Sequence, residues 1–185
     1  MEKLLPLHTS KSINLEQLRE NIDYLVASMS AYMCDCLVVC LAGENHQTGL
    51  ILKVETEDKK YSFRIDWTTP VTPHLIGATQ DEERTTEWGA MGIALLLARE
   101  LTEYPYICTR RKGDGIDFCL SKSENVFIYD ARLEVSGIRK GSLTNTLEKR
   151  LLVKKKQTER SDTSNKPAFI SITEFSEPKS LFVKK

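Results

Sequence analysis

Hydrophobic positions recur at helical spacing in two long segments of the chain. In residues 14–33, leucine, isoleucine, valine and methionine return every three or four positions, which predicts an amphipathic helix with Asn14 as its N-cap. In residues 80–103, an acidic opening that suits the positive end of a helix leads into the nearly uniform apolar run WGAMGIALLLA. We expect this second helix to be buried between layers of the fold.

Alternating apolar and polar positions predict strands elsewhere. Residues 48–67 alternate on both sides of the polar stretch TEDKK, which is typical of a β-hairpin. Further strand patterns are YICTRR, GIDFCLS, VFIYDARLEVSGI and AFISITEF, the last at residues 168–175. Residues 36–42 (CLVVCLA) suit either a buried strand or the end of the first helix. Residues 141–162 combine leucines at helical spacing with many lysines and arginines, which predicts a basic amphipathic helix.

From residue 80 onward the predicted order is helix, three strands, helix and strand. This order is typical of a mixed central sheet flanked by helices, in an α/β or α+β fold. A chain of 185 residues is long enough to form one compact unit. We divide it into a helix and β-hairpin extension (1–79) packed on a core (80–175). Residues 176–185 are expected to be a poorly ordered tail or an edge to which a partner docks.

Charge is distributed unevenly, although the net charge is zero. Residues 1–100 hold nine Lys and Arg against fifteen Asp and Glu, a net of −6, and residues 101–185 hold 17 against 11, a net of +6. The asymmetry is compatible with nucleic acid approaching the basic half, with packing of one half on the other, or with an acidic partner. No apolar run is long enough to cross a membrane, and the first residues do not resemble a secretion signal, so we expect a cytoplasmic protein without a membrane partner.

Three of the five cysteines lie close together. Cys34, Cys36, Cys40 and His46 invite a zinc interpretation, but the spacing differs from that of the usual paired zinc ligands. Cysteine is also among the most frequently buried residue types, and the sequence around Cys40 is apolar. The pattern therefore favours buried thiols over a zinc site.

Acidic residues occupy two of the predicted strands, where they are poorly favoured. Alternation places Asp130, Arg132, Glu134 and Ser136 on one face of their strand and apolar residues on the other. If the two strands are antiparallel neighbours with their apolar faces together, Asp117 meets the row that contains Glu134. These carboxylates then either converge on a metal ion or are solvated and paired with bases, such as Asp130 with Arg132.

The segment GID, followed after a short connection by EVS, resembles the core motif of the PD-(D/E)XK nucleases, over residues 80–175. The resemblance implies a restriction-endonuclease-like core in which Asp117 and Glu134 bind Mg²⁺ or Mn²⁺. It also implies Glu87, from the preceding helix, as a further metal ligand. The implied activity is hydrolysis of phosphodiester bonds in DNA or RNA. Restriction, repair or phage defence is the context that the resemblance alone implies.

One position departs from the family motif. The family has a lysine where this chain has Ser136. A hydroxyl can hold a water molecule but supplies no positive charge, so a site with Ser136 needs a base from elsewhere. Arg132 lies on the same predicted face and is one substitute. Other bases close in sequence are Arg110, Arg111, Lys112 and Lys140.

Basic residues also suggest where nucleic acid would bind. The predicted contacts to the phosphate backbone are Arg110, Arg111, Lys112, Arg139, Lys140, Lys154, Lys155 and Lys156. The alternative for the basic helix is an ordinary solvated face. Two other functions stay open: a catalytically inactive nuclease-fold subunit that binds nucleic acid, a protein partner or a second copy, and a small interaction protein in which all the acids are solvated.

Overall fold

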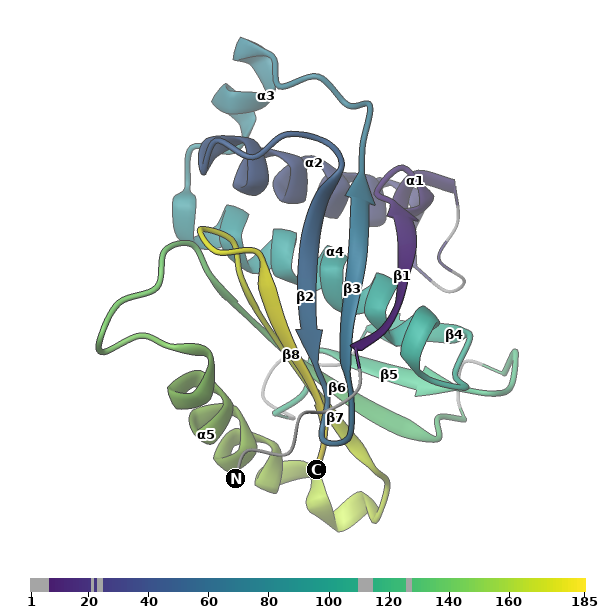
Figure 1. Cartoon of the computed structure of the whole chain (residues 1–185). Helices are drawn as coiled ribbons and strands as arrows, with labels where there is room; N and C mark the ends of the chain where they lie inside the picture. The colour runs from purple at the N-terminus through teal and green to yellow at the C-terminus, as the bar shows by residue number, and fades with distance from the viewer. Residues whose placement is uncertain (1–6, 21, 23–24, 110–114, 126–127) are drawn as a thin grey trace.

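A single mixed β-sheet of eight strands organises the chain (Figure 1), in a computed structural model that describes residues 7–20, 22, 25–109, 115–125 and 128–185. The strand order is β1-β3-β2-β8-β7-β6-β5-β4. The strands are β1 (Leu7–Asn14), β2 (Leu50–Glu55), β3 (Lys60–Asp66), β4 (Tyr106–Thr109), β5 (Phe118–Ser121), β6 (Ala131–Ile138), β7 (Ala168–Glu174) and β8 (Lys179–Lys184).

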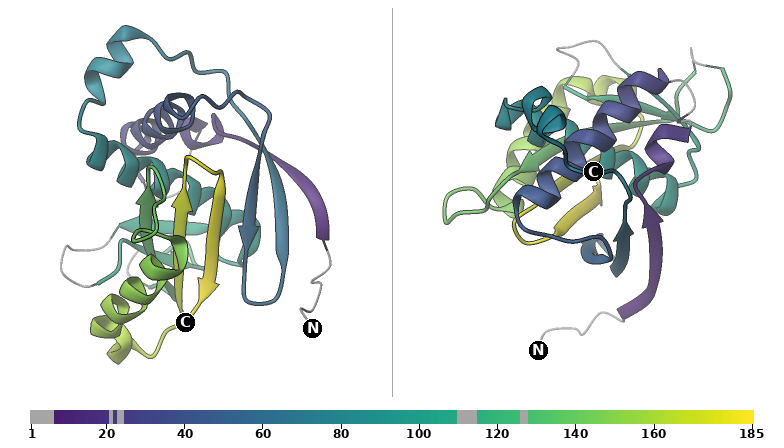
Figure 2. Two further views of the ribbon diagram at one scale, coloured as in Figure 1. Left: turned by 60° about the vertical axis from the view of Figure 1, so that its left-hand side comes forward. Right: turned by 90° about the horizontal axis from the view of Figure 1, so that it is seen from above.

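Helices cover both faces of this sheet. Those described are α1 (Gln17–Glu20), α2 (Ala27–Gly43), α3 (Pro73–Ala78), α4 (Glu82–Leu101), α5 (Leu147–Thr158) and the 3₁₀ helix η1 (Glu159–Ser164). Helices α2 and α4 pack against each other, and α4 also contacts β6 and β7. Helix α5 contacts β6, β7 and β8 from the opposite side of the sheet, as Figures 1 and 2 show. The mixed α/β architecture predicted from the sequence is therefore confirmed.

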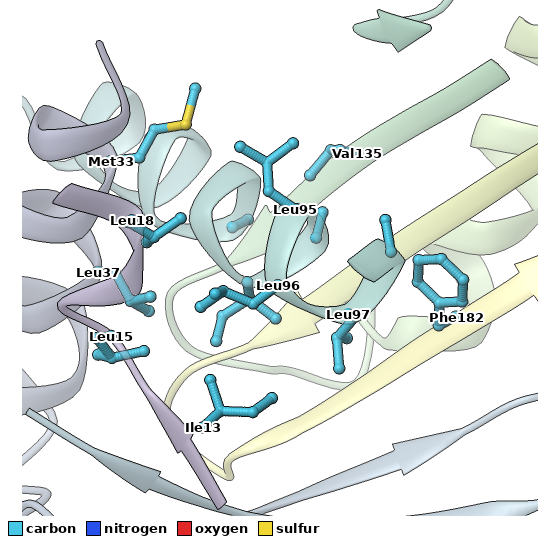
Figure 3. Packing of buried hydrophobic residues seen from close by; sticks show 14 of the residues in the cluster. Ile13, Leu15, Leu18, Met33, Leu37, Leu95, Leu96, Leu97, Val135 and Phe182 are labelled. Carbon is cyan, nitrogen blue, oxygen red and sulfur yellow. The ribbon is translucent and has the colours of Figure 1, made fainter. Parts of the chain in front are cut away.

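The larger hydrophobic core lies between the sheet and the two long helices. Figure 3 shows the leucines of α4 beside Leu37 of α2, with Val135 of β6 and Phe182 of β8 close by. Helix α4 is apolar nearly all round, so it can pack against α2 and against the sheet at once. A smaller core, which includes Ile138 and Leu147, lies under α5 on the other face. Strand β6 is consequently covered on both sides.

From α4 onward, the order of elements agrees with the prediction. Helix α4 is followed by β4, β5, β6, α5 and β7. Strands β4, β5 and β6 are successively antiparallel, and β6 is parallel to β7. The predicted hairpin is also confirmed as β2 and β3. Helix α4 is capped by Asp81, whose side chain accepts a hydrogen bond from the Arg84 N–H.

The N-terminal part differs from the prediction. A single helix over 14–33 was wrong, because Asn14 ends a strand, β1, that pairs with β3. The apolar run 36–42 belongs to α2, which continues to Gly43. The segment between the hairpin and α4 contains the short helix α3.

The C-terminal residues are not a tail. Residues 179–184 form β8, which lies in the interior of the sheet between β2 and β7. Ser180, Phe182 and Val183 are buried there. The expectation of a poorly ordered end or a docking edge was therefore wrong for this segment. Within the described part of the chain, no helix has the length and hydrophobicity needed to span a membrane.

Candidate active site at the edge of β6

Strands β5 and β6 separate at the point where the two motif acids lie. The last described pair of their ladder is Phe118 with Leu133, closed by a hydrogen bond from the Asp117 N–H to the Leu133 carbonyl at 3.0 Å. Beyond it, the Val135 N–H donates to Asp117 Oδ2 at 2.8 Å instead of to a strand carbonyl. The Asp117 side chain thus accepts a hydrogen bond from β6 at the point where the pairing between β5 and β6 ends.

Asp117 and Glu134 face each other because of this register. The register of the two antiparallel strands sets them opposite one another, and opposite residues project from the same face of a sheet. This is the face covered by α5, since Leu133 and Val135 point toward α4 on the other side. The predicted meeting of the two acids is therefore found. Glu134 is only 1% exposed, so the face is buried rather than solvated.

A lysine from α5 binds the buried glutamate. Lys154 Nζ donates to Glu134 Oε1 at 2.5 Å, and its side chain is 17% exposed. The second oxygen, Glu134 Oε2, is buried and has no hydrogen-bond donor among the described residues. One oxygen of the carboxyl is therefore neutralised by a cation, and the other is left to a proton or to a ligand.

The pKa values of both acids are raised above their ordinary values, mainly by burial. Burial, and after it the Asp117 charge, raise the pKa of Glu134 from 4.5 to about 7 against the opposing effect of Lys154. The pKa of Asp117 is also raised, mainly by burial, while the Val135 N–H opposes the rise. A proton on Glu134 can be donated to Asp117, which would satisfy the oxygen that has no donor.

A hollow of about 460 Å³ opens along the edge of β6 beyond these acids. Ser136 and Glu87 both line it, from β6 and from α4. Glu87 is exposed, and its charge raises the pKa of Asp117, so it belongs to the same electrostatic cluster. Basic side chains from α5, Arg150 and Lys154, line the opposite wall. The hollow thus has carboxylates and cations within reach of one bound group.

Arg132 is engaged elsewhere, although it shares the face of Glu134. Its guanidinium donates to the Lys166 carbonyl at 2.6 Å, to Ser161 Oγ at 2.8 Å and to Asp162 Oδ1 at 3.1 Å. The ion pair of Arg132 with Asp162 replaces the expected one with Asp130, whose carboxylate instead accepts the Lys122 N–H. Arg132 therefore binds the segment that follows α5, which includes η1. The base that contacts the motif acids is Lys154.

The remaining predicted bases are scattered. Arg110, Arg111 and Lys112 lie outside the described residues. Arg139 lines the hollow but is paired with Glu44 at 2.9 Å, at the end of α2. The exposed bases are Lys140, before α5, and Lys155 and Lys156, on its outer face.

The cysteines of α2 are buried, as the sequence favoured. Burial raises the pKa of Cys34 and of Cys36 to about 11, and that of Cys40 to about 12, so all three are protonated thiols at neutral pH. Cys34 and Cys40 donate to backbone carbonyls of Leu15 and Thr85. These thiols pack the core between α2 and α4.

The role of Lys154 was missed in the sequence, although a signal was present. Leu147, Leu151, Lys154 and Thr158 recur at spacings of four, three and four, which places them on one face of a helix. That face is the one packed on the sheet, and a lysine within it needs a buried acid as its partner. Because the whole basic helix was interpreted as one charged surface, the sheet-facing position of Lys154 was not predicted.

The donor set at this edge suits a hard divalent cation. Such ions take carboxylate oxygens, and Glu134 Oε2 is a buried carboxylate oxygen that no described residue binds, next to a second carboxylate. Glu87, which lines the neighbouring hollow, is a third acid near this edge, and its charge raises the pKa of Asp117. These carboxylates are of the chemical kind that binds Mg²⁺ or Mn²⁺, although the described residues contain no group of three or more His, Cys, Asp or Glu arranged to hold a metal ion.

Comparison with known proteins gave no family model, no curated relative and no solved structure that matches this chain.

Proposed function

We propose that the chain is a metal-dependent nuclease-like enzyme that hydrolyses phosphodiester bonds of DNA or RNA. The observation that supports this proposal is the convergence of Asp117, Glu134 and Lys154 beside an open hollow. Two acids and one ammonium are the groups that the motif requires, and here the ammonium comes from α5 instead of position 136. The proposal also assigns a restriction-endonuclease-like core to residues 80–175.

The two acids are the proposed ligands of Mg²⁺ or Mn²⁺, with Glu87 assisting. When bound, such an ion lowers the pKa of a coordinated water and offsets the negative charge of the phosphate. Asp117 is held for this role by the Val135 N–H, which fixes one carboxylate oxygen and leaves the other available. The low polarity around Glu134, at 1% exposure, strengthens every charge interaction there.

Lys154 provides the positive charge for the reaction. In hydrolysis a water oxygen forms a bond to phosphorus and the bond to the leaving ester oxygen breaks. The water loses a proton, the leaving oxygen gains one, and negative charge builds up on the phosphoryl oxygens between these events. In this proposal the Lys154 ammonium, bound to Glu134 at 2.5 Å, stabilises that charge, and Ser136 on the opposite wall holds the water.

The basic groups around the hollow would hold the rest of the strand. Arg150 lines it, and Lys155 and Lys156 continue the positive charge on the outer face of α5. Contacts of lysine and arginine to phosphates supply affinity that is independent of sequence. Restriction, repair or phage defence is a context that rests on the family resemblance.

The ion pair itself favours a second function. Lys154 already occupies one oxygen of Glu134, and a proton shared with Asp117 can satisfy the other, so the cluster can be neutral without a metal. The chain would then be a catalytically inactive nuclease-fold subunit that binds nucleic acid, a partner protein or a second copy of itself.

Cleavage assays separate the two functions. Single- and double-stranded DNA and RNA are incubated with the chain and Mg²⁺ or Mn²⁺, in parallel with Asp117→Ala, Glu134→Ala and the exposed control Glu57→Ala. An enzyme predicts cleavage that falls by about 100-fold or more in the first two variants and is unchanged in the control. No cleavage with any substrate or ion, together with nucleic-acid binding that neither variant alters, would contradict the nuclease proposal.

A further inference from the structure

A second hollow adjoins the candidate active site on the side of α2. Its volume is about 360 Å³, close to the lower end of the roughly 300–1,000 Å³ typical of small-molecule sites. The wall is mostly apolar and is rich in sulfur and aromatic groups: Met29, Met33, Trp88, Met91 and Phe118. A space of this size suits one flat ring system rather than a long chain.

Trp88 is held in place at this hollow. Its ring packs edge-on against Tyr32, with ring centroids 5.4 Å apart, and the side chain is only partly buried. Met29 and Met91 are likewise partly buried, whereas Met33 is 1% exposed and forms the closed end of the wall. Thioethers and indole rings are polarisable surfaces on which a flat ring can stack.

The two hollows share one wall residue, Glu87, close to the candidate catalytic acids. Glu87 lines both of them, and Asp117 lines the apolar one. On the α5 side the first hollow is lined by the cations Arg150 and Lys154, and on the α4 side by Glu82, Glu83 and Glu87. A ligand that spans both would therefore present an apolar ring to Trp88 and a negatively charged group to α5, with the acids between them.

We propose that the apolar hollow binds one nucleobase of the strand whose phosphate lies at Asp117 and Glu134. This inference rests on the proposed function and narrows its substrate class. A nucleotide has a flat ring that suits the apolar hollow and an adjacent phosphate that suits the cations of the first hollow. The carboxylate of Glu87, on the shared wall, can accept a hydrogen bond from the polar edge of a base.

The substrate is therefore a single strand, or a strand with an unpaired base at the cleavage point. A base inside a duplex is stacked on both faces and paired along its edge, so it must leave the stack to enter a side pocket. Stacking of one base on an aromatic side chain contributes about 1–3 kcal/mol, which corresponds to roughly a 5- to 150-fold change in affinity.

Tryptophan fluorescence tests this inference without altering the pocket. The chain has two tryptophans, so Trp67→Phe leaves Trp88 as the only reporter. Binding of a single-stranded oligonucleotide in Ca²⁺ should quench Trp88. A set of oligonucleotides, each with one abasic position, should contain one member whose affinity is about 5- to 150-fold weaker. Met91→Ala should weaken the intact oligonucleotide by a comparable factor and leave the abasic one unchanged.

The outcomes also distinguish this inference from the proposed function. Equal affinity for every abasic oligonucleotide, or equal quenching by a duplex, would overturn the base pocket even if the chain cleaves DNA. Quenching that is lost at one abasic position, without cleavage in Mg²⁺ or Mn²⁺, would support the base pocket and contradict the nuclease activity. A Trp88 signal that only an apolar peptide produces would assign the hollow to a protein partner and overturn the inference.

Discussion

Lys154 shows how one residue can belong to a core and to a candidate site at once. Its stem lies on the packed face of α5 together with Leu147 and Leu151, and its ammonium binds Glu134 on the sheet face that α5 covers. A buried acid and a buried base each cost free energy alone, so each explains why the other is tolerated. Burying an acid and a base together costs free energy that an apolar pair would not, and such clusters with shifted pKa values are more frequent at functional sites.

Replacing this lysine tests the assignment at the residue scale. In Lys154→Met the stem volume is retained and the charge is lost, so we expect single-turnover cleavage to fall by about 100-fold or more. The neighbouring Lys155→Met, which removes an exposed charge one position away, should change the rate by less than about threefold. Equal rates for the two variants would assign the catalytic cation to another residue.

The pKa of Glu134 gives a second expectation at the residue scale. With a pKa of about 7 in the folded protein, Glu134 is protonated below that pH, and a metal ion must displace the proton. Mn²⁺ affinity should therefore rise by about tenfold per pH unit up to pH 7 and level off above it. Calorimetric titrations at several pH values measure this, and a flat profile in the wild type would place the metal elsewhere.

At the scale of elements, the strength of the local pattern decided what could be predicted. Helix α4 and the hairpin β2–β3 have an unbroken period and clear turn residues, and the sequence located both. Strands β1 and β8 are as long as the strands of the hairpin, but they exist because distant strands pair with them. Pairing of that kind is not visible in a local period, so 14–33 was read as one helix and 176–185 as a tail.

In the candidate site, too, one part could be predicted from the local sequence pattern and another could not. The facing of Asp117 and Glu134 follows from alternation along two neighbouring strands, so the sequence sufficed for it. The partner of Glu134 depends on where α5 lies on the sheet, which no spacing within β6 can specify. Arg132 was the natural choice on its own strand, yet η1 and the Lys166 carbonyl engage it.

Helix α5 has two faces with separate roles, and salt dependence can test the outer one. The double variant Lys155→Gln with Lys156→Gln removes two exposed charges without touching the packed face. We expect the slope of log K against log salt concentration for DNA binding to fall by about one to two. The matched double variant at Lys53 and Lys59, exposed on the hairpin, should leave the slope unchanged. Identical slopes in both would remove α5 from the nucleic-acid interface.

At the scale of the whole molecule, β8 joins the N-terminal hairpin to the rest of the sheet. It is parallel to β2 on one side and antiparallel to β7 on the other. The continuity of the sheet, and of the core beneath it, therefore depends on the last residues of the chain. Phe182 is central to this connection, since it is 3% exposed and stacks on Phe169 with ring centroids 5.6 Å apart.

Phe182→Ala tests whether the sheet folds as one unit. Truncating a buried phenylalanine costs about 3–5 kcal/mol, a large share of the roughly 5–15 kcal/mol that stabilises a domain. Trp67 lies in the N-terminal part and Trp88 in α4, so single-tryptophan variants report on each part separately. In urea, Phe182→Ala should lower both midpoints equally, because β8 stabilises both parts through one ladder. The exposed control Lys184→Ala should leave them unchanged. If only the Trp67 midpoint moved, the hairpin extension would be a separate folding unit resting on an independent core.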